Sequence, residues 1–391
     1  VDNNSLIKNL ILEAIRYQKE NNINIALKKY KEVLKLDPYN IQSHNNLGLI
    51  YKNQGDYKKS IICFEDAIKI NPVYQNAINN IAIVFFEIGE YSKAIKKLQK
   101  LININPSLYS VYCNLGLCYE KVEDSQKAID IYKLVPKTDK NFLNAQYNLG
   151  LLFFKIKKYK NAKKIFKSIN FKKSKSYYLK CLYKLNDKIN LSKELDNEIK
   201  KKTVNAFIGS IVSLSKIKFG INKKNLFCEN PLNFTKIINL NDQHDFNQIF
   251  VKTFEQILEN KDFQNKPQPL LVNGIQSASN IFFYENNNIK KIKKIIHDEV
   301  ENYLQLFKNY DCGLFKNWPK EYYLDGWIVK MKSGGNIKPH IHEHGWLSGS
   351  IYINVPSKNE PNSGNLVVSL NDETSRTKYN KTNNISKIID V

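Results

Sequence analysis

The stretch Leu47-Gly-Leu-Ile-Tyr51 decides the fold of the first half of the chain, because close copies of it return at a fixed spacing. The copies are Ile81-Ala-Ile-Val-Phe85, Leu115-Gly-Leu-Cys-Tyr119 and Leu149-Gly-Leu-Leu-Phe153, each 34 residues after the one before. Each copy has a large apolar residue, then a small one, and an aromatic residue four positions after the first. A fixed period of this length indicates stacked units that share one continuous core.

A second set of small and large residues predicts a second helix in every unit. The small residues are Ala26, Ser60, Ala94, Ala128 and Ala162, and the large residues four positions later are Tyr30, Phe64, Leu98, Tyr132 and Phe166. Small residues let two helices approach closely, and the aromatic residues fill the space to the next unit. Over residues 7–174 the pattern resembles the tetratricopeptide repeat. This resemblance implies an all-α right-handed superhelix with a concave groove for a protein or peptide.

Two departures from the pattern predict where the array weakens. Glu123 stands where Gly55 and Gly89 stand in earlier units, and Lys140 stands where a proline closes the first three units. We expect a degenerate helix pair at about 174–202 to cap the array, so that the repeat domain spans 1–202. The residues leave open whether the groove binds a partner or only orients the second domain.

Composition gives weaker guidance. The chain has 60 Lys and Arg against 37 Asp and Glu, a net charge of +23, which is compatible with nucleic acid or an anionic membrane. The lysines occur along many helices in an Asn- and Ile-rich chain, so we interpret them as compositional bias and favour neither partner. Six cysteines without paired spacing indicate free thiols in a reducing cytoplasm. No run of 18 apolar residues predicts a membrane segment, and the start at Val1 suggests a fragment.

The second half changes from helices to short strands. Helices are expected over 203–221, 245–258 and 288–307, from their three- and four-residue apolar spacing. Strands are expected over 324–332, 337–342, 347–355 and 365–370, with a turn at Ser333-Gly-Gly-Asn336. The sequence therefore predicts an α + β multidomain chain whose second domain, 203–391, is a β-barrel or jelly roll backed by helices.

Three of the six histidines, His340, His342 and His344, fall within five residues. On an extended strand they point to the same side, because successive side chains alternate between faces. Neutral imidazole is a common ligand of transition metals. The cluster is therefore a candidate metal site, with backbone-bonded surface histidines as the alternative.

Three runs of the second half resemble a family of 2-oxoglutarate- and iron(II)-dependent oxygenases. They are Gly326–Gly335, Lys338-Pro-His-Ile-His342 and Gly345–Pro356. The resemblance implies a double-stranded β-helix, His340 and His342 as iron ligands, and Tyr352 as a hydrogen-bond partner of 2-oxoglutarate. His342 stands where related enzymes carry a carboxylate, and His344 is not expected to bind the metal. Ascorbate is the reductant that such enzymes imply.

In this family a distal histidine and a cosubstrate-binding arginine follow further along the chain, whereas no histidine follows His344. We therefore expect a jelly roll that is incomplete at its C-terminus and inactive as given, within a longer hydroxylase. The alternative is a non-catalytic interaction scaffold with a cupin-like metal-binding or structural β domain. Neither the substrate nor the oligomeric state follows from the sequence.

Overall fold

A computed structural model gives the architecture of most of the chain. It describes residues 3–260, 265–266, 268, 270–278, 280–284, 286–338, 345–355, 365–369 and 386–389. The three clustered histidines lie outside the described residues. Within the described residues, no helix is long and apolar enough to cross a membrane.

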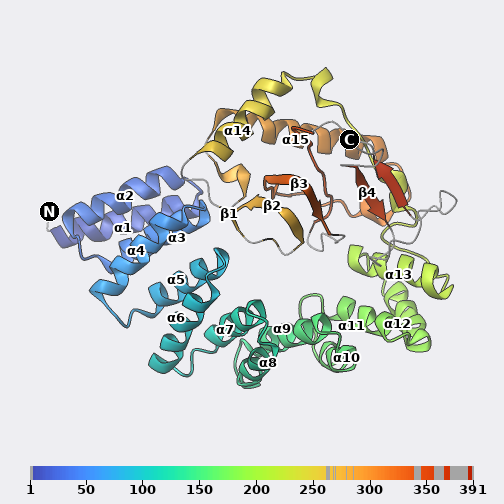
Figure 1. Cartoon of the computed structure of the whole chain (residues 1–391), viewed down its shortest axis with the longest axis horizontal. Coiled ribbons are helices and arrows are strands. Elements are labelled where there is room, and N and C mark those ends of the chain that lie inside the picture. Colours follow the sequence, from blue (N-terminus) through green and yellow to red (C-terminus); the bar gives the residue numbers. More distant parts are fainter. Residues whose placement is uncertain are drawn as a thin grey trace.

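Residues 3–200 form antiparallel helix pairs stacked side by side, as the 34-residue period predicts (Figure 1). The first helices of the pairs are α1 (Asn3–Lys19), α3 (Ile41–Asn53), α5 (Gln75–Glu87), α7 (Tyr109–Lys121), α9 (Phe142–Lys155) and α11 (Ser174–Lys184). The second helices are α2 (Ile23–Leu36), α4 (Tyr57–Ile70), α6 (Tyr91–Ile104), α8 (Ser125–Lys133), α10 (Tyr159–Ser168) and α12 (Lys188–Lys200). Along the middle of the array, α5, α7 and α9 lie on the side of the second domain, and α6, α8 and α10 lie outside (Figure 1).

The small residues of the repeat let the two helices of a pair touch. A Cβ atom added to Gly48 would lie 2.5 Å from Phe64, one added to Gly116 would lie 2.3 Å from Tyr132, and Gly150 faces Phe166 in the same way. In the third unit the corresponding buried residues are Ala82 and Leu98. The smaller, aliphatic partner thus goes with alanine and the three larger aromatic partners go with glycine, because the volume between the helices is fixed by close packing.

The turn within each of the first five pairs uses one left-handed residue at the repeat period. These residues are Asn21, Gly55, Gly89, Glu123 and Lys157, with φ angles between 60° and 84°. Glu123 keeps this conformation although a non-glycine residue there costs about 1–2 kcal/mol. The fourth unit therefore retains the turn geometry without its glycine.

The array ends in a helix that continues its packing. Helix α13 (Ala206–Phe219) begins at Asn205, whose side chain accepts the Ile208 N–H at 3.0 Å, and ends at the left-handed Gly220. Its apolar face joins α8–α12 in one buried cluster. Helical packing therefore runs past residue 202, where we predicted the domain boundary, and that boundary stays a prediction.

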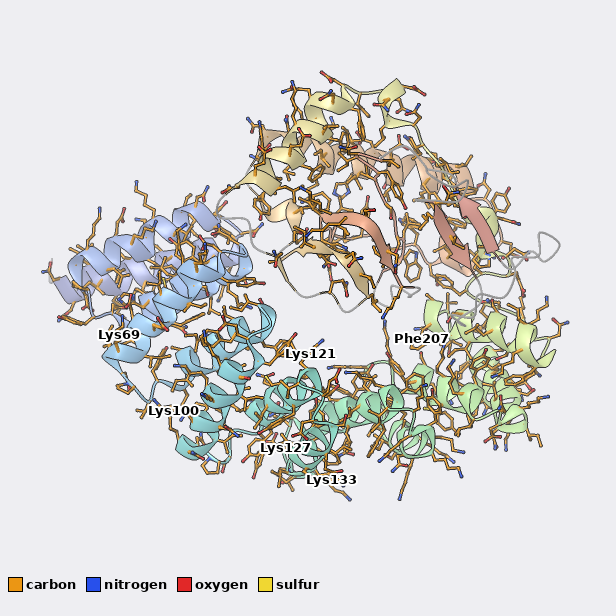
Figure 2. The ribbon with its side chains drawn as sticks, viewed as in Figure 1. Lys69, Lys100, Lys121, Lys127, Lys133 and Phe207 are labelled. Atoms are coloured by element: carbon orange, nitrogen blue, oxygen red, sulfur yellow. The ribbon has the colours of Figure 1, made fainter. Side chains whose placement is uncertain are left out.

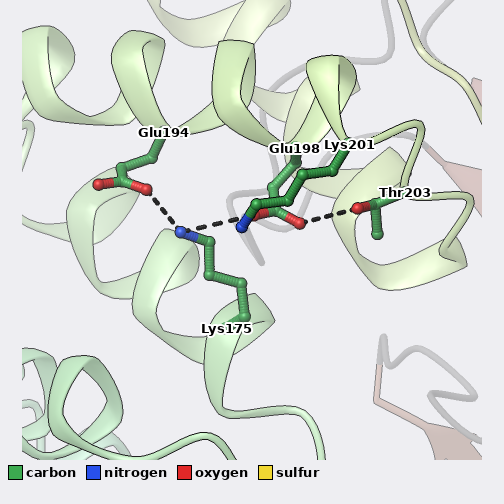
Figure 3. Close-up of polar contacts among 5 residues, drawn as sticks. All are labelled: Lys175, Glu194, Glu198, Lys201 and Thr203. Atoms are coloured by element: carbon green, nitrogen blue, oxygen red, sulfur yellow. Dashed lines mark hydrogen bonds and ion pairs between the residues drawn. The ribbon is translucent and has the colours of Figure 1, made fainter.

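A polar network fixes α11 and α12 to the segment that leads into α13 (Figure 3). The Glu198 carboxylate is buried and accepts the Thr203 hydroxyl at 3.0 Å. Lys175 Nζ lies 3.6 Å from Glu198 and 2.5 Å from Glu194, and Lys201 Nζ lies 3.4 Å from Glu198. Several donors around one buried carboxylate offset the free energy of removing it from water.

The second domain packs helices against short antiparallel strands. Its helical elements are η1 (Pro231–Phe234), η2 (Leu240–Asp242), η3 (Asn247–Val251), α14 (Lys252–Glu259), η4 (Ile281–Phe283), α15 (Asn287–Phe307) and α16 (Gly313–Lys316). Its strands are β1 (Asn265–Lys266), β2 (Leu271–Ser277), β3 (Val329–Ile337), β4 (Leu366–Ser369) and β5 (Ser386–Ile389), paired as β1-β2-β3 and β4-β5. The expected helices and the strand at 365–370 are present; η3 is a π-helical turn that leads into α14.

One turn prediction and one strand prediction are wrong, and the first of them has a clear physical cause. Residues 333–336, predicted as a turn, lie inside β3, and residues 347–355 form no strand. The pairing of β2 with β3 shifts at Gly334 and Gly335. Gly274 pairs with Met331, but Val272, only two residues away, pairs with Asn336. The glycines allow a β-bulge, which uses the same conformational freedom as a turn. The strand predicted at 337–342 begins at the last residue of β3, and its remainder lies largely outside the described residues.

A jelly roll is not shown by the described residues, which form one three-stranded and one two-stranded sheet. The burial of β3 also differs from its apolar pattern. Ile328, just before β3, is buried, whereas Trp327 and Met331, on the other face, are 37% and 45% exposed.

Ala278, just after β2, joins the buried cluster of the second to fourth repeats, so the second domain contacts the array.

Candidate functional site

The segment that carries His340, His342 and His344 follows β3 and precedes Trp346 along the chain. The Lys338 N–H, directly after β3, donates to the Leu270 carbonyl at 2.8 Å. Because the three imidazoles lie outside the described residues, their role as ligands stays a prediction. The described residues on each side of them are well anchored.

Trp346 is fixed on the second domain by one hydrogen bond and one aromatic contact. Its indole Nε1–H donates to the Leu314 carbonyl at 3.2 Å, and its ring meets Phe227 edge-on at 5.6 Å between centroids. Phe227 belongs to a cluster around Cys228, Tyr303, Cys312, Leu314 and Phe315. The structure packs Trp346 partly buried against this cluster.

Tyr352, predicted to bind 2-oxoglutarate, lies in the segment 348–355, which has no regular secondary structure. Its side chain is 41% exposed, and partial burial raises the pKa of its phenol. The hydroxyl therefore stays protonated at neutral pH and can donate a hydrogen bond to a carboxylate. Its contact with the cosubstrate stays a prediction.

The chemistry of the two predicted ligands fits iron(II), since imidazole is a common ligand of that metal. Within the described residues, no three His, Cys, Asp or Glu side chains lie together in a way that could hold an ion. His297, in α15, pairs its Nδ1 with the Tyr322 hydroxyl at 2.9 Å. The fit to iron therefore rests on His340 and His342.

Asparagines form a row along the first helices of the array. Asn80 Nδ2 in α5 donates to Asn45 Oδ1 in α3 at 3.0 Å, and Asn114 Nδ2 in α7 donates to Asn79 Oδ1 in α5 at 3.3 Å. Asn46, Asn80, Asn114 and Asn148 each directly precede the apolar residue that opens the repeated stretch, so the sequence carried this signal at the 34-residue period. Sequence reasoning missed these residues because it followed only apolar and small positions.

Family comparisons agree with this repeat geometry. Models described as "Tetratricopeptide repeat" or "TPR repeat" match residues 16–55, 41–74, 82–122, 109–141 and 144–174. The array is built of tetratricopeptide repeats. In the second domain, residues 325–388 match the model described as "Putative 2OG-Fe(II) oxygenase", and this match includes His340, His342 and Tyr352.

Solved structures similar to this chain include two that are described as tetratricopeptide repeat proteins. A tetratricopeptide repeat protein from Parabacteroides merdae is 16% identical, with 54% of this chain and 86% of that chain covered at a TM-score of 0.45. PilW, a type IV pilus biogenesis factor, is 16% identical, with 53% and 98% covered at a TM-score of 0.46. YrrB, described as having an unusual peptide-binding site, is 18% identical, with 48% and 98% covered at a TM-score of 0.38. No curated protein matches the chain.

The tetratricopeptide array also contains a partly buried carboxylate, Glu120. Burial raises the pKa of Glu120, at the end of α7, while the Tyr132 hydroxyl, which donates to Glu120 Oε1 at 2.6 Å, lowers it. The basic residues Lys121 and Lys155 lower it further. Figure 2 shows Lys121 on the side of the array that faces the second domain.

We expect Glu120→Gln to raise the melting temperature at neutral pH. A carboxyl whose pKa is raised in the folded state loses stability as pH rises through that pKa, because ionisation is penalised in the fold. Glutamine keeps an acceptor for Tyr132 and carries no charge. Thermal unfolding followed by circular dichroism should show a gain at pH 7.5 that disappears below the ordinary range of a glutamate pKa. A gain of equal size at all pH values would contradict this account.

Proposed function

We propose that this protein is a 2-oxoglutarate- and iron(II)-dependent oxygenase that hydroxylates a protein or peptide held by its tetratricopeptide array. The observation that carries the proposal is the oxygenase-family match of residues 325–388, which contains the His340 and His342 pair. When bound, iron(II) would activate O₂, which is the oxidant, for hydroxylation of a C–H bond, and 2-oxoglutarate would be oxidised at the same time to succinate and CO₂. The chain itself has to hold these groups, orient the substrate and limit access of water.

The two imidazoles are proposed to hold the metal, and the Tyr352 hydroxyl is proposed to donate to a cosubstrate carboxylate. Trp346 fixes the position of the chain just after the histidine segment, because its indole is both hydrogen-bonded and packed. Rigid neighbours keep ligands close to a productive geometry. These contributions concern binding and orientation.

The amide row of the array supports a role in substrate binding. Asparagine side chains offer both donors and an acceptor, which match the N–H and C=O groups of an extended peptide. The middle repeats present their first helices toward the second domain (Figure 1), and Ala278 contacts the array. A peptide bound along this face would therefore lie on the same side as the oxygenase segment.

Iron(II) binding tests the proposal directly. Calorimetric titration without oxygen should show that His340→Ala and His342→Ala each weaken iron binding by about 100-fold or more, since even the outer-shell partners of ligands contribute 10–100-fold. His44→Ala, the same exchange in the array, should leave the affinity unchanged. With oxygen, ascorbate and 2-oxoglutarate, any succinate formed should depend on both histidines. Iron affinity that survives in the double variant would leave the non-catalytic scaffold as the better account.

A further inference from the structure

The positive charge of the chain is concentrated in one segment. Between Asp139 and Asp187 the sequence contains thirteen lysines and neither aspartate nor glutamate. This segment covers α9, α10 and α11. The even spread assumed from overall composition therefore does not hold for the fifth and sixth helix pairs.

Helix α10 presents part of this charge as a stripe. Lys160, Lys164 and Lys167 are exposed and lie at positions i, i+4 and i+7, on one face of the helix, while Ala162 and Phe166 are buried. The stripe spans about 10 Å along the helix axis. Among the residues that the structure describes, none of the three lysines has an acidic partner within ion-pair distance.

Lysines before α10 extend the stripe. Lys157 and Lys158 are exposed in the turn that leads into the helix. We call Lys157, Lys158, Lys160, Lys164 and Lys167 the α10 lysine surface. Helix α10 lies on the outer side of the array, away from the second domain (Figure 1). Lys163, beside the stripe, contacts Asp187, the acidic residue that ends the segment, at 3.5 Å.

The α10 lysine surface has charge without an apolar anchor. Among the described residues, no large hydrophobic side chain is exposed between Leu143 and Ile189, whereas α4 exposes Ile62 at 56%. Protein interfaces use a buried apolar or aromatic centre surrounded by polar groups. Phosphate backbones are bound through charge alone. Lysine, a compact point charge, suits phosphate contacts that do not read base sequence.

We propose that the α10 lysine surface binds the phosphate backbone of a nucleic acid without sequence specificity. This interaction uses the outer face of the array and does not depend on the oxygenase chemistry proposed for the second domain. A bound nucleic acid strand would leave the inner face free for a peptide.

Fluorescence anisotropy with a labelled 20-nucleotide single strand tests the proposal on the full chain. Lys160→Gln, Lys164→Gln and Lys167→Gln together should weaken binding by about 100-fold at about 0.1 M salt. The slope of log affinity against log salt should fall in magnitude by about 2, because each phosphate contact contributes about 0.7. Circular dichroism should show the same melting temperature, since all three side chains are exposed.

The matched control removes three exposed lysines from α4. Lys58, Lys59 and Lys69 lie among Asp56, Glu65 and Asp66, and two of them pair with acids at 2.6 and 2.9 Å. Their change to glutamine should alter the affinity by less than about three-fold, although the change in net charge is the same. An equal loss in both variants would show a non-local charge effect and overturn the proposal. Binding to phosphatidylserine vesicles or polyglutamate, with no binding to the oligonucleotide, would also overturn it.

Discussion

We expect Gly313→Ala to destabilise the second domain by about 3 kcal/mol, at the upper end of what overpacking a filled site costs. A Cβ atom at Gly313 would lie 2.0 Å from the Leu226 carbonyl oxygen. That backbone cannot move freely, because the next carbonyl along, Phe227 O, accepts the Leu314 N–H at 2.9 Å and the Cys312 thiol at 3.1 Å. To remove the clash, the segments around Leu226 and Gly313 have to move apart. Both segments contribute residues to one aromatic cluster, which would therefore be disrupted.

Tryptophan fluorescence isolates this effect. Trp318, Trp327 and Trp346 all lie in the second half of the chain, and Trp318 and Trp346 pack on the cluster beside Gly313. The melting temperature followed by this signal should fall by roughly 6–12 °C, at about 2–4 °C per kcal/mol for a domain of this size. Gly349→Ala is the control, because nothing lies within 4 Å of its added Cβ atom. Equal, small shifts in both variants would show that the backbone near Leu226 adapts.

The array could be predicted because its determinants are local and repeated. Each unit carries the same small and large positions, so one period fixed the helix pairs and their close contacts, such as Gly150 against Phe166. The amide row was overlooked although it has the same period. Its hydrogen bonds join residues 35 apart, such as Asn45 and Asn80, and become evident only when neighbouring first helices are stacked.

The strands were predicted less well because register depends on long-range pairing. Gly334 and Gly335 indicated a turn, but β3 continues through them opposite Asn273, which has a φ of 51°. A Cβ atom at Gly335 would lie 2.9 Å from the Asn273 carbonyl oxygen, so the glycine accommodates close contact between two strands. Local sequence does not distinguish a bulge from a turn, since both need glycine. The ligands His340 and His342 stay predictions from the family motif.

The second large effect is expected in the fourth repeat. The ring of Tyr132 is attached to the backbone at one end and hydrogen-bonded to Glu120 through its hydroxyl at the other. We expect Gly116→Ala to destabilise the array by about 2 kcal/mol net, from an overpacking cost of up to about 3 kcal/mol and a gain of about 1 kcal/mol in helix propensity. The added Cβ atom would lie 2.3 Å from the Tyr132 ring, and that ring cannot swing away without breaking the bond from its hydroxyl to Glu120. Thermal unfolding followed by circular dichroism at 222 nm measures the loss.

Two further variants separate the tether from the clash. Gly150→Ala, opposite Phe166, meets a similar ring at 2.7 Å that has no hydroxyl, so its loss should be smaller. Tyr132→Phe removes the tether, so adding Gly116→Ala to it should cost less than in the wild type, with a coupling energy of at least about 0.5 kcal/mol. Additive losses would mean that the core around the ring, and not the bond to Glu120, resists the movement. A net gain from Gly116→Ala would mean that helix propensity outweighs packing, and the selection of glycine at this position would then need another cause.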